Sequence, residues 1–188
     1  PEEVVEADVG AIVLADAFEA TSDEDLRAFG LGQGPSVVRN SEVARRSLLT
    51  NFVRDAVRLP SGRIPQTFAV VITPHFNQPG IEYENYNLSV SAIYRAVRLR
   101  EIVPEAEVTV FLHDYRGTGK GHHQWYLKAL DAGVRVERAD TLSIAPDDTA
   151  EEATIHYTSL DGEPHTESVE LAILVTGQSP PSQMDELS

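Results

Sequence analysis

The sequence predicts an α/β fold in which a parallel βαβαβ unit is followed by an antiparallel β-meander. Three short apolar runs, at 67–74, 107–114 and 134–139, have the length and the branched side chains of buried strands. Two stretches between them, 85–104 and 119–133, carry apolar residues at helical spacing. Strands and helices that alternate at these lengths form right-handed crossovers between parallel strands. The sheet is therefore expected to be Rossmann-like.

The ends of these elements carry their own signals. Pro104 stops the first helix, and Gly133 follows the second helix in the C′ position. From 141 to 171 the helical spacing disappears, and the pattern predicts strands joined by a hairpin with Asp161-Gly162 as its turn. The apolar run 172–177 then predicts one more strand.

The region before residue 67 is less regular. The apolar run 9–18 predicts a buried strand, and 19–36, rich in Gly, Pro and Asp, predicts a loop. The stretch 40–59 carries apolar residues near helical spacing, with Asn40 or Ser41 as the candidate cap. We therefore expect a single amphipathic helix over 40–59.

Composition restricts the partners of this chain. Thirty acidic and fifteen basic residues give a formal charge of −15, so nucleic acid and anionic membrane surfaces would repel it. No apolar run approaches the roughly 20 residues that a membrane helix needs, and no membrane insertion is expected. The sequence contains no cysteine, which excludes disulfides and cysteine-ligated clusters from this segment and agrees with a cytoplasmic location. It starts at Pro1 without an initiator Met, so we expect a segment of a longer protein.

Four stretches carry a family resemblance. They are GAIVLADAF (10–18), GLGQGPSVVRNSEVARRSL (30–48), AEVTVFLHDYRGTGKGHHQWYLKALDAGVRVERAD (106–140) and LAILVTGQSPP (171–181). Together and in this order they resemble the A-subunit of heterodisulfide reductase and, more broadly, the two-dinucleotide-binding-domain flavoproteins of the thioredoxin reductase type.

The resemblance implies a domain division. Residues 67–178 would form a nucleotide-binding-like domain, 1–66 a crossing strand, loop and linker helix from a flavin domain outside this sequence, and 179–188 a flexible tail. It also implies FAD in the full-length protein, electron transfer, and other subunits of a redox complex as partners; a homo-oligomer is compatible with it. Many family members carry cysteines near the region that matches 73–91, where they are expected to ligate an iron–sulfur cluster, and none occurs here.

The pyridine-nucleotide site lacks its expected glycine-rich turn. The matching stretch, 70–87, contains no G-x-G-x-x-G, and Pro74 and Pro79 remove amide donors that would face a pyrophosphate. Glu82 and Glu84 would repel phosphate. The sequence therefore favours a Rossmann-like scaffold with a degenerate NAD(P) site, with NAD(P) binding as the weaker alternative.

The corner after the second strand holds the candidate binding residues. Asp114 could accept hydrogen bonds from a ribose, and Arg116 could pair with a phosphate. Gly119 and Lys120 belong to GTGKG (117–121), which could bind an anion or form a simple corner. In both cases the structural alternative, Asp114 paired with Arg116 or a flexible corner, stays open.

Other candidates are weaker. His122 and His123 point about 100° apart on a helix, so with His113 they predict no metal site. A core or interface role is favoured over base stacking for Trp125 and Tyr126. Gly177, in the second crossing motif, is the candidate contact to the flavin by resemblance. No catalytic residue is predicted.

Three hypotheses follow. The first is a segment of an FAD-dependent oxidoreductase similar to the heterodisulfide reductase A-subunit, inactive in isolation. The second is a non-catalytic interaction module of a multi-subunit redox complex, favoured by the missing fingerprint and the missing cysteines. The third is an unrelated nucleotide-sugar or phosphate-binding enzyme on the same scaffold.

Overall fold

The computed structural model describes residues 8–11, 13, 18–49, 53–77, 84–117, 119–147 and 149–179. Seven strands form one sheet in the order β2-β8-β3-β4-β5-β6-β7. Their bounds are β2 Val37–Arg39, β3 Thr67–Ile72, β4 Glu107–Leu112, β5 Arg135–Asp147, β6 Glu152–Ser159, β7 Pro164–Val169 and β8 Leu171–Val175. Strands β2, β8, β3, β4 and the start of β5 run parallel, and β5, β6 and β7 are antiparallel. The predicted βαβαβ unit and meander are confirmed.

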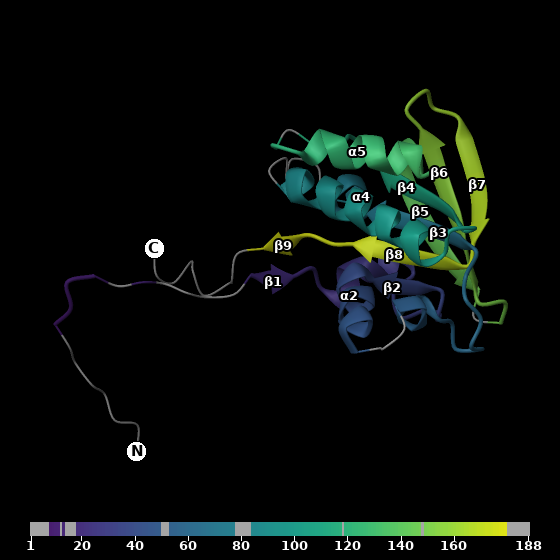
Figure 1. Cartoon of the computed structure of the whole chain (residues 1–188), viewed down its shortest axis with the longest axis horizontal. Coiled ribbons are helices and arrows are strands. Elements are labelled where there is room, and N and C mark those ends of the chain that lie inside the picture. Colours follow the sequence, from purple (N-terminus) through teal and green to yellow (C-terminus); the bar gives the residue numbers. More distant parts are fainter. Residues whose placement is uncertain are drawn as a thin grey trace, which may run out of the picture.

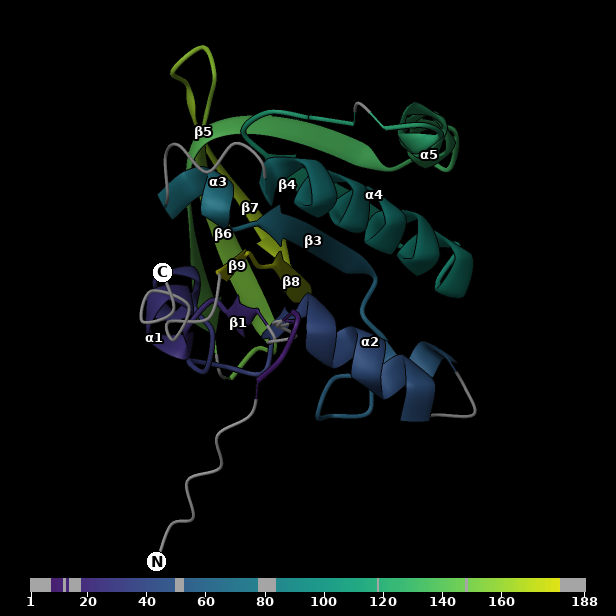
Figure 2. The same ribbon diagram turned by 90° about the vertical axis from the view of Figure 1, so that its left-hand side faces the viewer.

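The helices are α1 Asp23–Leu26, α2 Asn40–Leu49, α3 Pro74–Asn77, α4 Glu84–Ile102 and α5 His122–Asp131, with 3-10 turns η1 Arg27–Phe29 and η2 Val53–Val57. Of these, α2, α4 and α5 cover one face of the parallel strands (Figures 1 and 2). Helix α4 buries Ala92, Ile93, Ala96 and Val97 completely, because residues at this spacing share one face of a helix. Helix α5 ends at the predicted signal, with Gly133 at φ +76°.

The meander and the α1–η1 segment cover the opposite face (Figure 2). Phe111 of β4 and Leu174 of β8 pack there in one cluster with Ile155 of β6. Side chains alternate across a strand, so the neighbours of Phe111, Val110 and Leu112, belong to the helix-side cluster. The parallel strands are therefore buried on both faces, which explains their continuous apolar sequences.

A separate two-stranded ribbon leaves the domain beside the end of β8 (Figure 1). Its strands, β1 Glu19–Ala20 and β9 Gln178–Ser179, are antiparallel. Thr21 continues the pairing, because its amide and its hydroxyl both donate to the carbonyl of Gly177, at 3.3 and 3.0 Å. The two ends of the domain thus leave it side by side.

Two predictions for the first sixty residues are wrong. In the predicted buried strand 9–18 the described residues form no strand, and Val9 and Val13 are 62% and 87% exposed; residues 12 and 14–17 lie outside the described part. The predicted loop 19–36 contains α1 and η1. Ser22 caps α1 by accepting a hydrogen bond from the amide of Asp25 at 3.1 Å, and Phe29 of η1 is buried.

Two further boundaries differ from the prediction. The single helix expected over 40–59 is divided into α2 and η2, with 50–52 outside the described residues. The strands expected at 134–139 and 141–148 are one strand, β5, whose register shifts between Ala139 and Thr141. A register shift of this kind bends the strand, and it lets β5 leave the parallel sheet and enter the meander. The predicted Asp161-Gly162 turn is confirmed, with Gly162 at φ +90°.

Gly30, the residue that follows η1, lies against Pro146 of β5 and has no room for a side chain. It has φ +78°, and a Cβ there would lie 2.7 Å from Cδ of Pro146. We expect Gly30→Ala to cost ~1–2 kcal/mol for the left-handed backbone and a further ~1–3 kcal/mol for overpacking, measured by urea unfolding. Gly32→Ala is the control, because Gly32 has φ +73° and nothing within 4 Å of its added Cβ. Equal losses in both variants would contradict the contact between Gly30 and Pro146.

Candidate functional site

The candidate site is the edge where the parallel strands end. In open sheets of this type, ligands bind at the carboxyl ends of the strands, next to the strand at which the chain changes direction across the sheet. Here that strand is β3, because the chain moves to β4 and β5 on one side while β8 and β2 lie on the other. The corners after β3, β4 and β8 therefore decide what this edge can bind.

In the described part of the corner after β3, backbone amides are used to hold the fold together. The amide of Thr73 donates to the carbonyl of Val175 at 3.1 Å and ties β3 to β8. Pro74 begins α3 and has no amide hydrogen, and the amide of Phe76 donates to the carbonyl of Thr73 at 3.1 Å. Residues 78–83, which include Pro79 and Glu82, lie outside the described residues. The amides of Thr73 and Phe76 are thus engaged within the fold.

The corner after β4 brings Asp114 and Arg116 together. Nε of Arg116 lies 3.2 Å from the Asp114 carboxylate, and Nη2 of Arg138, from β5, lies 3.6 Å from it. Arg138 also donates from Nε to the carbonyl of His113 at 3.3 Å. A ribose hydroxyl would have to compete with two guanidinium groups for the same carboxylate. Two guanidinium groups around one carboxylate form a structural ion-pair cluster at the surface.

Residues 119–121, the candidate anion corner, form a hydrogen-bonded turn at the start of α5. Gly121, the residue before the helix, has φ +84°, and the amide of His122 donates to the carbonyl of Gly119 at 3.1 Å. The Tyr115 hydroxyl donates to the carbonyl of His122 at 3.2 Å. The pKa of Tyr115 is raised, mainly by burial and to a smaller extent by the nearby Tyr126. Lys120 is exposed on this turn, and Thr118 lies outside the described residues.

Trp125 and Tyr126 are held by neighbours within the domain. Trp125 meets Tyr94 of α4 edge to face, with centroids 5.1 Å apart, and Nζ of Lys128 lies 4.8 Å from the Trp125 ring centroid. Tyr126 packs against Tyr115 at 4.6 Å. Both rings also pack against the helix-side core, which agrees with the structural role favoured by the sequence. Among the described residues, no three His, Asp or Glu side chains are grouped as a metal ion would require.

Gly177 lies on another part of the same edge. It follows β8, whereas Asp114 follows β4, and β3 lies between those strands. Gly177 borders a cavity of about 410 Å³ between α2, α4 and the end of β8. Asn40 and Ser41 of α2 and Ser91 of α4 also line it. The sequence analysis did not predict Asn40, Ser41 and Ser91 as site residues, because α2, α4 and the end of β8 lie far apart in the sequence.

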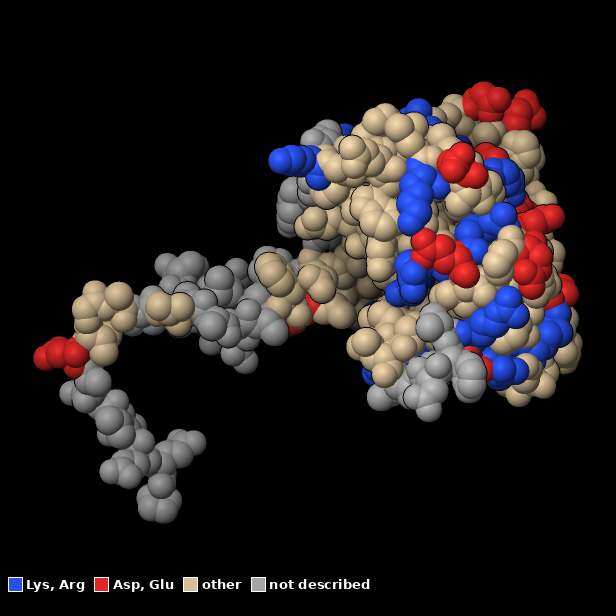
Figure 3. Space-filling view, in the orientation of Figure 1, with Lys and Arg blue, Asp and Glu red and all other residues tan. Residues whose placement is uncertain are grey.

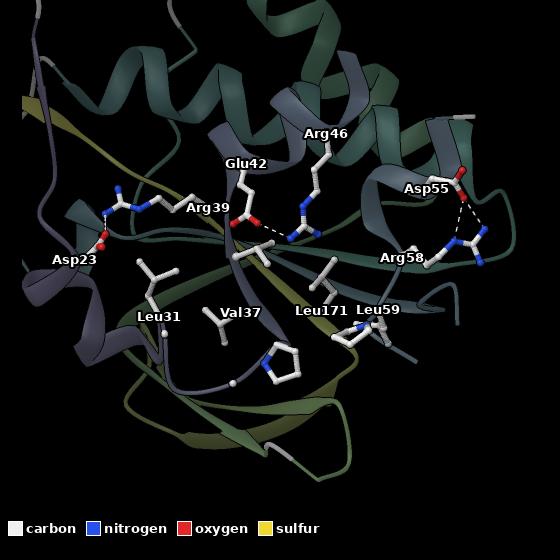
Figure 4. Close-up of a pocket in the computed structure, with 15 residues that line it drawn as sticks. Asp23, Leu31, Val37, Arg39, Glu42, Arg46, Asp55, Arg58, Leu59 and Leu171 are labelled. Atoms are coloured by element: carbon white, nitrogen blue, oxygen red, sulfur yellow. Dashed lines mark hydrogen bonds and ion pairs between the residues drawn. The ribbon is translucent and has the colours of Figure 1, made fainter. Parts of the chain in front are cut away.

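A second hollow, of about 680 Å³, lies beside β2, which is an outermost strand of the seven-stranded sheet. Its lining includes three arginines, each paired with an acid, as Figure 4 shows. The pairs are Arg39 with Asp23, Arg46 with Glu42, and Arg58 with Asp55. Each guanidinium is matched by a carboxylate, so this hollow has no net preference for anions or cations.

Charges of both signs are interleaved on the face of the molecule drawn in Figure 3. On the face drawn in Figure 3, lysine, arginine and acidic side chains gather over the part of the domain away from β1 and β9. No helix in the described part of the chain combines the length and the apolar character needed to cross a bilayer.

Comparison with known proteins identifies relatives of one kind, the A-subunits of heterodisulfide reductases. The chain is 22% identical over 183 residues to that of the ferredoxin/F420H2-dependent CoB-CoM heterodisulfide reductase of Methanosarcina acetivorans, a match that covers 96% of this chain and 23% of the relative. It is 25% identical over 191 residues to an iron-sulfur A-subunit of the CoB-CoM heterodisulfide reductase of Methanopyrus kandleri, covering 97% of this chain and 29% of the relative. The chain thus spans about a quarter of the length of these relatives. No protein-family model matches it.

Among solved structures, the fold matches a flavoprotein. The FAD-bound cadaverine monooxygenase of desferrioxamine biosynthesis from Erwinia amylovora superposes with a TM-score of 0.50 at 9% identity, covering 92% of this chain and 46% of that one. At this identity the match supports the fold alone, and it confirms the predicted Rossmann-like α/β fold. The resemblance read from the sequence motifs is also confirmed: across nearly its whole length, this chain is related to the A-subunit of heterodisulfide reductase.

Proposed function

We propose that this chain is the nucleotide-binding-like part of a FAD-dependent electron-transfer protein similar to the heterodisulfide reductase A-subunit. The observation that carries the proposal is the β1–β9 ribbon, which brings Glu19–Ala20 and Gln178–Ser179 side by side. A domain inserted into another domain needs two adjacent connections of this kind. In the proposal, the chain continues through β1 and β9 to a flavin domain outside this sequence. The inserted domain lies between these two strands, so it includes β2 and α2 as well as 67–178.

The flavin, when bound to the full-length protein, would supply the electron-transfer chemistry. This chain would contribute orientation, with Gly177 and the ribbon nearest to the flavin domain. Other subunits of a redox complex are the proposed partners, because the relatives are named as subunits of such a reductase. We assign no catalytic residue within the chain.

In the same proposal the pyridine-nucleotide site is degenerate. Two observations support this: Pro74 starts a short helix where a glycine-rich turn would lie, and two arginines occupy the carboxylate of Asp114. Arg116, Gly119 and Lys120 would then shape the corner before α5 without holding a phosphate.

Calorimetric titration of the 188-residue chain with NADH, NADPH and FAD tests the degenerate site. We expect millimolar or weaker binding of all three nucleotides, and the same weak binding in the Asp114→Ala variant. Micromolar binding of a nucleotide that is lost in Asp114→Ala would show a working site and overturn this part of the proposal. The domain arrangement has a separate test: the longer gene product should purify with the absorption spectrum of a bound flavin.

A second candidate function, a non-catalytic interaction module, has its own support. Tyr94 of α4 and Leu127 and Leu130 of α5 are large apolar side chains with 46%, 51% and 45% of their surface exposed. Replacing both leucines by serine distinguishes the candidates. Loss of partner subunits from the purified complex, with the flavin reduced as before, would favour the interaction module.

A further inference from the structure

The cavity beside Gly177 has an unusual lining for so acidic a chain. Its described lining contains amides, hydroxyls and apolar groups but no Asp, Glu, Lys or Arg, although the sequence has 30 acidic residues. The hollow beside β2, in contrast, is lined by three acids. The volume of about 410 Å³ lies within the roughly 300–1,000 Å³ that small-molecule sites occupy.

The guanidinium group of Arg95 contacts one of the residues that line this cavity. Asn87, Ser91 and Arg95 follow one another at four-residue spacing on α4, so they share one face of the helix. Asn87 and Ser91 line the cavity, and Nε of Arg95 donates to Oδ1 of Asn40, another lining residue, at 2.6 Å. Arg95 therefore acts on the cavity through Asn40.

The charge of Arg95 is not balanced by an acid in the described part of the chain. Its side chain is partly buried. Burial, the largest influence, lowers its pKa; the neighbouring Tyr94 raises the pKa and Arg98 lowers it. The arginines around the hollow beside β2, by comparison, each have a carboxylate partner. A partly buried positive charge with no acidic partner favours an anion nearby.

The hydrogen bond from Arg95 also determines which polar group of the Asn40 side chain can contact a ligand. Because its amide oxygen accepts from Arg95, its remaining polar group is the NH2, which can only donate. The hydroxyls of Ser41 and Ser91 can donate to the same space, and Phe18 and Leu88 supply an apolar wall. We propose that this cavity binds a small organic anion, a carboxylate or a phosphate monoester, whose charged group contacts Asn40 and whose apolar part contacts Phe18 and Leu88.

The test is a titration of the 188-residue chain with phenyl phosphate and with benzoate, followed by the backbone amide NMR signals. We expect one of these anions to shift the signals of Asn40, Ser91 and Gly177 saturably, and benzyl alcohol, which has the same ring without the charge, to leave them unchanged. The anion that binds decides between a phosphate monoester and a carboxylate. The site does not depend on the proposed flavin domain, so its failure would leave that proposal intact.

Two variants make the assignment specific. Asn40→Asp keeps the shape but adds a carboxylate that pairs with Arg95 and repels the ligand, so binding should weaken at least about tenfold. Arg46→Gln is the matched control, because Arg46 lies on the same helix as Asn40 and is already paired with Glu42; its affinity should equal that of the unmodified chain. Binding of neither anion, shifts outside the cavity, unchanged affinity in Asn40→Asp, or an equal loss in Arg46→Gln would each overturn the proposal.

Discussion

A chain that ends at Glu170 is expected not to fold. Strand β8 lies between β2 and β3, and every residue of Leu171–Val175 is buried. Burial of a Leu, Ile or Val side chain contributes ~1.5–3 kcal/mol, so losing four of them removes a free energy comparable to the ~5–15 kcal/mol that stabilises a whole domain. The deletion would also leave β2 and β3 without their shared hydrogen-bonding partner. Circular dichroism during urea titration should show no cooperative transition.

A chain that ends at Ser179 is the matched control. It keeps β8, β9 and every strand pair of the described part of the protein. We expect its unfolding midpoint to equal that of the 188-residue chain. A cooperative transition in the chain that ends at Glu170 would show that β8 is not a central strand of this sheet.

The parallel half of the fold could be predicted because its signals are local. The apolar runs that became β3 and β4 are flanked by helices whose spacing, stops and C′ glycine all lie within a few residues of the ends observed. The Asp161-Gly162 turn is equally local. Where each element carries its own signal, the order of elements is enough to predict the sheet.

The N-terminal errors have the opposite origin. The run 9–18 is apolar, but apolar sequence produces a buried strand only where another layer covers it, and Val9 and Val13 have none in this domain. Strand β2 was not predicted as a strand, because Val37–Arg39 is short and its partner, β8, lies more than a hundred residues later in the chain. Pairing at that distance leaves no local pattern.

In the candidate site, too, contacts between neighbours in the sequence could be predicted and contacts between distant residues could not. Asp114 and Arg116 are two residues apart, so their pairing could be foreseen as the structural alternative. Arg138 reaches the same carboxylate from β5, and Arg95 meets Asn40 across 55 residues of sequence. These contacts depend on how α2, α4 and β5 pack on the sheet, which the sequence alone does not determine.

Replacing Phe111 by alanine should destabilise the domain by ~3–5 kcal/mol, the usual cost of removing a buried aromatic ring. Phe111 is completely buried, and its ring meets that of Tyr157 at a centroid distance of 5.0 Å and an angle of 64°. The pair joins β4 of the parallel sheet to β6 of the meander, so the loss measures how strongly the two layers are packed together. Phe18→Ala is the control, because Phe18 is 67% exposed and should change the free energy of unfolding by no more than ~0.5 kcal/mol. If urea unfolding gave equal losses for both variants, the meander could not lie against the sheet, and the second layer of this fold would have to be assigned to another part of the chain.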